Sequence, residues 1–206
     1  MIKILSLDMQ GTLTSSEFSD YFWLELLPKK YSEKFNCSIE SAKQIISDKF
    51  SKMGKYNIKY YDDMYWAKWL GFETINELNT MDIIPKVNNE MYDFINTIKL
   101  PKIIISTTTE LFIRYELKEK ITDFYKTYSC VDYFKVGGKT KDVFLKVCKE
   151  LQISPKEMLH IGDSKIMDYE NAKKAGVNTV LFDGDLIRLK KEVIKYLEVW
   201  LWLKKW

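Results

Sequence analysis

Short apolar runs separated by turn residues and helical patterns dominate the second half of the chain. Five such runs predict buried strands, at residues 2–7, 102–106, 133–136, 158–161 and 179–182. Between the later runs, apolar residues recur at helical spacing over 141–151 and 168–175, and Gly176 follows the second stretch. Strands that alternate with helices need crossover connections, so the pattern predicts an α/β core with a mostly parallel sheet.

The stretch between the first and second runs has a different pattern, without a convincing strand. Apolar residues recur at helical spacing over 18–35, 38–53 and 60–71, with Pro28, Gly54 and Gly71 as expected helix ends. Thr14 and Glu17 have the spacing of a capping box at the first of these helices. We therefore expect residues 15–99 to form an inserted all-α domain, and residues 1–14 and 100–206 to form the core.

An aromatic stripe lies in the third of these helical segments. It consists of Tyr61, Tyr65, Trp66 and Trp69. Helical spacing of this kind favours the interior of the inserted domain, although some members of the stripe could face a cleft.

Composition narrows the class of protein. The 206 residues are 46% apolar, and the formal net charge of +3 comes with scattered lysines, so neither a basic stripe nor nucleic-acid binding is indicated. Three cysteines without a C-x-x-C spacing favour free thiols in a reducing compartment. Asp8 interrupts the first apolar run, and no run reaches the roughly 18 residues of a membrane span. We expect a cytoplasmic protein, and the composition leaves its oligomeric state open.

Polar residues suited to chemistry follow four of the predicted strands. They are Asp8 after the first, Ser106 and Thr107 at the second, Lys139 after the third, and Asp163 and Asp168 after the fourth. The carboxyl ends of parallel strands meet at one edge of a sheet, where ligands bind. Carboxylates there can hold Mg²⁺, while a hydroxyl and an ammonium group can hold a phosphoryl group.

Four segments carry these residues: "LDMQGTLT", "IIIST", "GGKTKDVF" and "HIGDSKIMDYENAKKAG". In this order they resemble the motifs of the haloacid dehalogenase superfamily of aspartate-nucleophile hydrolases. The resemblance covers residues 1–14 and about 100–183, with the insertion where a type 1 helical cap stands. It implies a Rossmann-like parallel-sheet core, an inserted all-α cap domain, and a Mg²⁺-dependent phosphatase or phosphotransferase acting on a small phosphorylated substrate.

The resemblance assigns Asp8 as the nucleophile that forms an aspartyl-phosphate. Ser106 would donate a hydrogen bond to the phosphoryl oxygens, with Thr107 as the competing hydroxyl. Gly11 and Thr12 would shape the loop that receives the phosphoryl group.

The same resemblance assigns the charged groups around the nucleophile. Lys139 would neutralise charge on the nucleophile and the phosphate, with Lys141 as the competing lysine. Mg²⁺ would be bound by the nucleophile, by Asp163 and by the main-chain oxygen of Gln10. Asp168 would support the metal's water shell or orient the lysine. His160, the one histidine, lies in an apolar strand and is interpreted as a core residue with satisfied hydrogen bonds.

Gln10 departs from the family pattern. Phosphatases of the superfamily have a second aspartate here, which protonates the leaving group and then activates water, and a glutamine can do neither. Loss of a general acid–base typically costs about 10²–10⁴-fold in rate. Three alternatives therefore stay open: a phosphonate hydrolase with a lysine from the cap, a haloacid dehalogenase-type hydrolase, and a slow or non-catalytic phosphate-binding regulator. Gly162 and Asp163 match the phosphatases, since the dehalogenases lack this pair.

Overall fold

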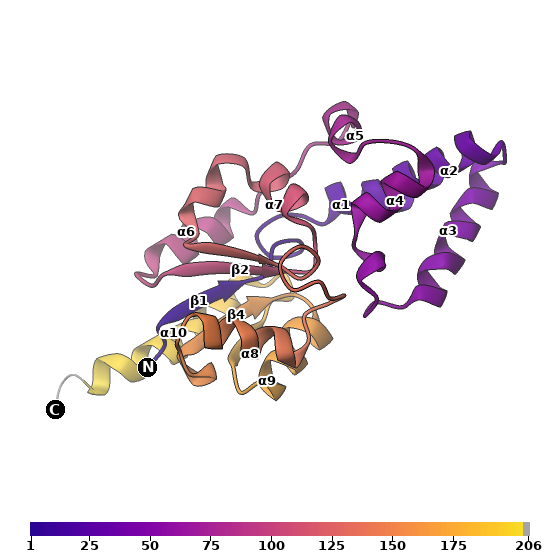
Figure 1. Ribbon diagram of the computed structural model, residues 1–206. Helices are drawn as coiled ribbons and strands as arrows, with labels where there is room; N and C mark the ends of the chain where they lie inside the picture. Colours follow the sequence, from indigo (N-terminus) through magenta and orange to yellow (C-terminus); the bar gives the residue numbers. More distant parts are fainter. Residues whose placement is uncertain (204–206) are drawn as a thin grey trace.

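Five parallel strands form a single sheet in the order β3-β2-β1-β4-β5 (Figure 1). The computed structural model describes the backbone of residues 1–203 and the side chains of residues 1–197. The strands are β1 (Ile4–Leu7), β2 (Lys102–Ser106), β3 (Lys126–Ser129), β4 (Met158–Gly162) and β5 (Asn178–Leu181). The predicted α/β fold with a parallel sheet is confirmed, and the first strand of the chain lies at its centre.

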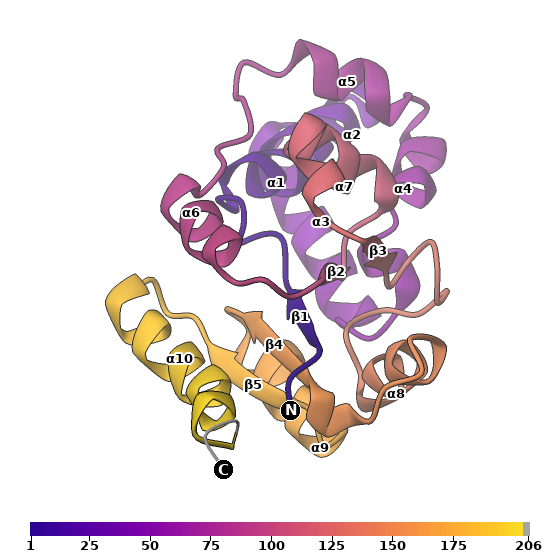
Figure 2. The same ribbon diagram turned by 90° about the vertical axis from the view of Figure 1, so that its left-hand side faces the viewer.

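Helices cover both faces of the sheet. One face carries α6 (Asn89–Thr97), α7 (Glu110–Leu117) and α10 (Leu186–Leu203), and the other carries α8 (Lys141–Glu150) and α9 (Asn171–Lys174) (Figure 2). Leu5 and Leu7 pack in the cluster with α6, α7 and α10, whereas Ile4 packs with α8 and α9. This is the two-residue alternation of a strand that is buried on both sides.

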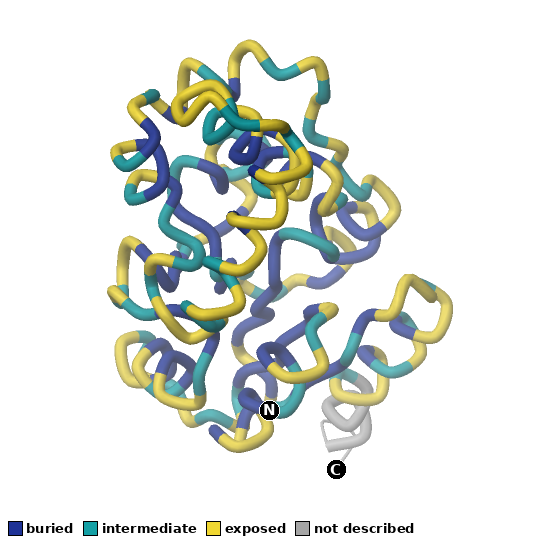
Figure 3. The backbone as a smooth tube through the Cα atoms, turned by 90° about the vertical axis from the view of Figure 1, so that its right-hand side faces the viewer, coloured by how far each residue is buried: buried dark blue, intermediate teal, exposed yellow. Residues whose placement is uncertain are grey.

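Burial follows this layering. Figure 3 shows buried positions along the strands in the interior and exposed positions on the outer sides of the helices. None of the helices in the described part of the chain could cross a bilayer, because none is both long enough and apolar enough.

The third strand is not where the apolar run predicted it. Residues 133–136 form a turn and loop, and β3 lies seven residues earlier. Because β3 is at the edge of the sheet, its first two residues, Lys126 and Thr127, are only half-buried, and their polar character hid the strand. From this loop, Phe134 and Val136 pack against the apolar cluster under α8 and α9, which explains the misleading apolar run.

The chain between β1 and α6 is helical and adds no strand to the sheet. Its elements are α1 (Glu17–Tyr21), a π-helical segment (Phe22–Leu26), α2 (Leu27–Phe35), α3 (Ile39–Met53), a 3₁₀ turn (Ile58–Tyr60), α4 (Asp63–Leu70) and α5 (Thr74–Thr80). These helices lie together beyond one end of the sheet (Figure 1).

The predicted helix ends in this region are correct at the glycines and wrong at the proline. Gly54 and Gly71 follow the last residues of α3 and α4. Pro28 ends no helix, because it occupies the first turn of α2, where its missing N–H is tolerated.

The capping box predicted at the first helix does not form. Ser16 is the residue that precedes α1, and its side chain makes no capping hydrogen bond. The Thr14 hydroxyl instead donates to Glu116 of α7 (2.8 Å), and Glu17 pairs with Lys86 (2.6 Å). Both side chains of the expected capping box therefore interact with residues that are distant in the sequence.

Two apolar clusters hold the helical region together. One contains Leu27, Ile46, Trp66 and Leu70, so Trp66 of the aromatic stripe lies in the interior, fully buried. The other joins the helical region to the core, because Phe112 of α7 packs against Phe18 and Phe22.

Candidate active site

The loop after β1 holds a carboxylate at the centre of the sheet edge. The Asp8 main-chain N–H donates to the carbonyl of Ile161 in β4 (2.8 Å), and the Met9 N–H donates to Asp8 Oδ1 (2.8 Å). The chain then turns back tightly, since three successive N–H groups, those of residues 12–14, point at the Met9 carbonyl. Asp8 is thereby fixed and buried directly beyond the strand.

Gly11 lets this loop approach the loop after β4. Its φ is +78°, and a Cβ at this position would lie 2.3 Å from Asp163 Oδ2. Only glycine combines this backbone conformation with so close an approach. Thr12 is buried beside it, and its hydroxyl has no hydrogen-bond partner among the described residues.

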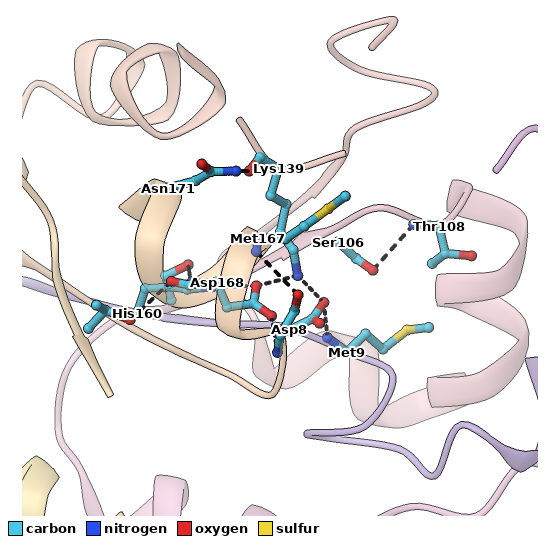
Figure 4. A network of polar contacts seen from close by, with 12 residues as sticks. Asp8, Met9, Ser106, Thr108, Lys139, His160, Met167, Asp168 and Asn171 are labelled. Carbon is cyan, nitrogen blue, oxygen red and sulfur yellow. Dashed lines mark hydrogen bonds and ion pairs between the residues drawn. The ribbon is translucent and has the colours of Figure 1, made fainter. Parts of the chain in front are cut away.

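Lys139 bridges two of the predicted carboxylates (Figure 4). Its Nζ lies 2.7 Å from Asp8 Oδ1 and 2.5 Å from Asp168 Oδ1, and the side chain is almost completely buried. Burial disfavours the charged lysine, but Asp168 and Asp8 outweigh it and hold the pKa of Lys139 above its ordinary value. The structure brings Lys139, and not the exposed Lys141, to Asp8.

Asp168 is held from several directions. Its Oδ1 also contacts His160 Nε2 (3.0 Å), and its Oδ2 accepts from the Ser164 N–H (2.9 Å). Burial alone would raise the pKa of Asp168, but Lys139 and His160 keep it well below the ordinary value. Asp168 is therefore an ionised group in contact with Lys139.

His160 is buried with both ring nitrogens satisfied, which agrees with its interpretation as a core residue. Nδ1 lies 2.9 Å from Ser6 Oγ, its register partner on β1, and burial lowers the pKa of His160. A neutral ring that donates from Nε2 to Asp168 and accepts from Ser6 satisfies all three groups. The contact with Asp168 had no signal in the sequence, because it depends on the loop after β4 folding back.

Asp8, Asp163 and Asp168 form a cluster in which oxygens of the three lie within 4.8 Å of one another. Burial raises the pKa of Asp8 to about 8, Asp168 adds to this rise, and Lys139 opposes it. Burial and the charge of Asp168 likewise raise the pKa of Asp163. Crowded carboxylates of this kind are relieved by a divalent cation.

The donor set fits Mg²⁺, which prefers oxygen ligands. Both oxygens of Asp168 already accept hydrogen bonds, whereas Asp163 is exposed. The Gln10 carbonyl accepts no hydrogen bond from the described residues. Asp8, Asp163 and this carbonyl are therefore available as ligands, with Asp168 behind them.

The two competing hydroxyl residues both lie at the carboxyl end of β2, the strand next to β1. Ser106 is buried, and its Oγ accepts from the Thr108 N–H (3.4 Å; Figure 4). Thr107 is half-buried and lines a cavity of about 250 Å³.

This cavity lies between the core and the helical region. From the core it is lined by Gln10, Thr107 and Thr108, and from the helical region by Ser19, Asp20, Trp23, Leu24, Phe50, Tyr60 and Tyr61. A neighbouring cavity of about 580 Å³ shares Trp23, Leu24, Phe50 and Tyr60 with it. Of the aromatic stripe, only Tyr61 lines the smaller cavity.

Gln10 has a partner that no sequence pattern indicated. Its Nε2 donates to Glu116 Oε1 (2.7 Å), and Thr14 donates to Glu116 Oε2. Glu116 is only 2% exposed, and burial raises its pKa to about 7 although both donors lower it. The two residues are 106 positions apart, so only the packing of α7 on the sheet brings them together.

Comparison with known proteins identifies the family of the chain. The model of the haloacid dehalogenase-like hydrolases matches residues 2–176. The chain belongs to this family of hydrolases. Among curated proteins, the GMP/IMP nucleotidase YrfG of Escherichia coli is 26% identical over 72 residues, which are 35% of this chain and 32% of that protein. The match thus spans about a third of the curated relative.

Solved structures of haloacid dehalogenase-like proteins share the fold. A phosphatase from Thermococcus onnurineus has a TM-score of 0.72 at 19% identity, covering 90% of this chain and 88% of that one. A 2-haloacid dehalogenase from Pseudomonas syringae has 0.57 at 14% identity, covering 97% and 100%. An enzyme from Bacteroides thetaiotaomicron, in complex with magnesium and inorganic phosphate, has 0.54 at 19% identity, covering 90% and 96%.

Proposed function

We propose that this hydrolase is a Mg²⁺-dependent phosphatase or phosphotransferase of small phosphorylated metabolites. The observation that carries the proposal is the buried ion-pair network in which Lys139 links the Asp8 nucleophile to Asp168. An ammonium group held by two carboxylates can stabilise charge on a phosphoryl group placed against Asp8. Asp163 and the main-chain oxygen of Gln10 complete the predicted metal ligands.

In the proposed reaction, an Asp8 oxygen attacks phosphorus and the bond to the leaving oxygen breaks, which leaves an aspartyl-phosphate. Lys139 stays next to the reacting oxygens, and a hydroxyl of Ser106 or Thr107 donates to the phosphoryl group. When bound, Mg²⁺ would keep Asp8 ionised and draw charge from the phosphoryl oxygens. Water then attacks phosphorus and releases phosphate, so Asp8 is regenerated.

We propose further that residues 15–99 act as the cap domain that selects the substrate. The cavity between this region and the core supports that role, because the cap side of the cavity is mostly aromatic and the core side is polar. Nucleoside monophosphates are the first esters to test, given the partial match to a nucleotidase.

Two alternatives have less support. A phosphonate hydrolase needs a cap lysine near phosphorus, but no lysine is among the described residues that line the Gln10 cavity. The candidate lysines of the proposed cap are Lys29, Lys30, Lys34, Lys55 and Lys68. Lys30 pairs with Glu77, Lys34 donates to a main-chain carbonyl, and Lys55 lines the neighbouring cavity. Dehalogenation is disfavoured because Asp163, in the pair that dehalogenases lack, is present beside Asp8.

The test is phosphate release from a panel of phosphate monoesters, acyl phosphates and phosphonates, with Mg²⁺ or with EDTA. We expect Mg²⁺-dependent release from at least one ester, and loss of that release in Asp8→Asn, which keeps the size of the side chain. No release from any compound would contradict the proposal. Binding of beryllium fluoride with Mg²⁺ but without turnover would instead favour the phosphate-binding regulator that Gln10 suggested.

A further inference from the structure

Glu116 is a buried carboxylate that the proposed chemistry does not use. Its two oxygens accept from two neutral donors, Gln10 Nε2 and Thr14 Oγ1, and no cation among the described residues pairs with it. Ile113 and Leu117, on either side of it in α7, are buried in the apolar cluster between the sheet and α6, α7 and α10. This packing fixes the position of the carboxylate. Burying a carboxyl group without a cationic partner costs folding free energy, so Glu116 is expected to have a role.

Glu116 explains why position 10 is a glutamine. Both Glu116 oxygens accept hydrogen bonds, and Gln10 supplies one of the two donors. An ionised aspartate at position 10 has no N–H to donate, and its side chain is shorter, so it could not replace this hydrogen bond. Gln10 and Glu116 therefore form a matched pair of donor and acceptor.

The pairing also sets the direction of the amide. Because Nε2 donates to Glu116, Oε1 is the acceptor atom that the amide has left, and no described residue donates to it. Gln10 lines the cavity that Thr107 and Thr108 also line. The amide can therefore present a hydrogen-bond acceptor to a small molecule in that cavity. Glutamine amides orient the attacking water in other phosphoryl-transfer enzymes.

We propose that Glu116 is a positioning residue for Gln10. It holds the Gln10 side chain so that the amide oxygen Oε1 binds the water that hydrolyses the aspartyl-phosphate. The inference rests on the proposed phosphatase function. In this step the water oxygen bonds to phosphorus, and the bond between phosphorus and the Asp8 oxygen breaks. The electron pair of the broken bond returns to the carboxylate, and both hydrogens of the water leave on dihydrogen phosphate. Gln10 orients the water and takes no proton.

The test separates formation of the aspartyl-phosphate from its hydrolysis. The full-length protein is mixed with Mg²⁺ and 4-nitrophenyl phosphate, whose leaving group needs little protonation. The fraction of phosphorylated protein at steady state is then measured by intact mass spectrometry after acid quenching. In Glu116→Gln the amide of Gln10 loses its fixed direction, so we expect about tenfold slower turnover together with a larger phosphorylated fraction.

Gln10→Ala should show the same two changes, and the double variant should be no slower than the slower single variant, since both substitutions remove one arrangement. Glu119→Gln is the matched control, because Glu119 is an exposed glutamate three residues further along the chain. It should behave as the unmodified protein. If Glu116→Gln does not fold, the inference is tested with Gln10→Ala alone. Gln10 lines a cavity, so its truncation should disturb folding less than a change at the buried Glu116.

Three outcomes would overturn the inference: unchanged turnover in both variants, slower turnover without a larger phosphorylated fraction, or additive losses in the double variant. A general structural defect would give the second of these outcomes. Failure of the proposed function looks different, because the unmodified protein would then release no 4-nitrophenol and carry no phosphate.

Discussion

At the scale of single residues, the site is a cluster of buried charged groups that stabilise one another. Three carboxylates lie close together, and Lys139 pairs with two of them. Burial raises the pKa of Asp8 to about 8, while Lys139 opposes the rise. The neutral His160 adds hydrogen bonds but no charge. The cluster therefore has more negative charge than its own partners neutralise, which is the reason to expect a cation.

This excess predicts a pH-dependent effect of Mg²⁺ on stability. The folded pKa of Asp8 lies above the ordinary value of 3.8, so without metal the free energy of unfolding should fall as the pH rises from about 4 to about 8. Mg²⁺ competes with protons for these carboxylates, so it should raise the melting temperature more at about pH 8.5 than at about pH 6. Thermal melts with Mg²⁺ and with EDTA at both pH values measure this.

Asp163→Asn is the control for that measurement. It removes one charge from the cluster at an exposed position, so it should reduce the effect of Mg²⁺ at both pH values. Equal Mg²⁺ effects at the two pH values in the unmodified protein would contradict the prediction.

At the scale of elements, the loop that carries Lys139 touches the helical region through its backbone. A Cβ on Gly137 would lie 2.5 Å from the main-chain carbonyl of Asn57, in the segment between α3 and the following 3₁₀ turn. The loop that carries Lys139 and the proposed cap are therefore in direct contact, and they can approach this closely because Gly137 has no side chain.

Gly137→Ala should force these two segments apart. Because both partners are backbone, they cannot adjust as a flexible side chain would, and we expect a loss of about 1–3 kcal/mol in the free energy of unfolding. Turnover should also fall, since the lysine loop shifts with the contact. Chemical denaturation and steady-state kinetics measure the two effects.

Gly54→Ala is the comparison for Gly137→Ala. Gly54 has a φ of +74° and open space around its Cβ position, so its substitution adds backbone strain without a clash. If Gly137→Ala is no more harmful to turnover than Gly54→Ala, the contact does not position the lysine loop.

At the scale of the whole molecule, helix α7 links the helical region to the core. Phe112 of α7 is fully buried and packs against Phe18, Phe22 and Trp23 of the helical region. The same helix packs its Ile113 into the core of the sheet. Helix α7 thus packs against both the helical region and the core of the sheet.

Phe112→Ala should uncouple the unfolding of the two parts. We expect a loss of about 3–5 kcal/mol and a broader or two-step urea transition, because the cavity opens at the junction. Phe144→Ala, in the cluster on the opposite face of the sheet, should cost a similar amount and keep one transition. Circular dichroism during urea titration distinguishes the two, and a single sharp transition in Phe112→Ala would contradict the prediction.

The strands that the sequence predicted are those whose burial leaves a strong pattern. Central strands such as β1 and β4 are apolar along most of their length because helices cover both of their faces, whereas β3 at the edge tolerates Lys126 and Thr127. The sequence also predicted that Asp8 and Asp168 would meet, since residues at the carboxyl ends of parallel strands share one edge. The order of the motifs along the chain was enough for the family.

Tertiary structure alone decided how the side chains are paired. The fold of the loop brings Lys139, rather than Lys141, into contact with Asp8. Thr14 donates to Glu116 instead of forming the expected capping box. The partner of Gln10 could not be predicted, because α7 reaches it only by packing on the sheet. Sequence patterns report the period and burial of each element, whereas a contact between distant elements depends on how those elements pack together.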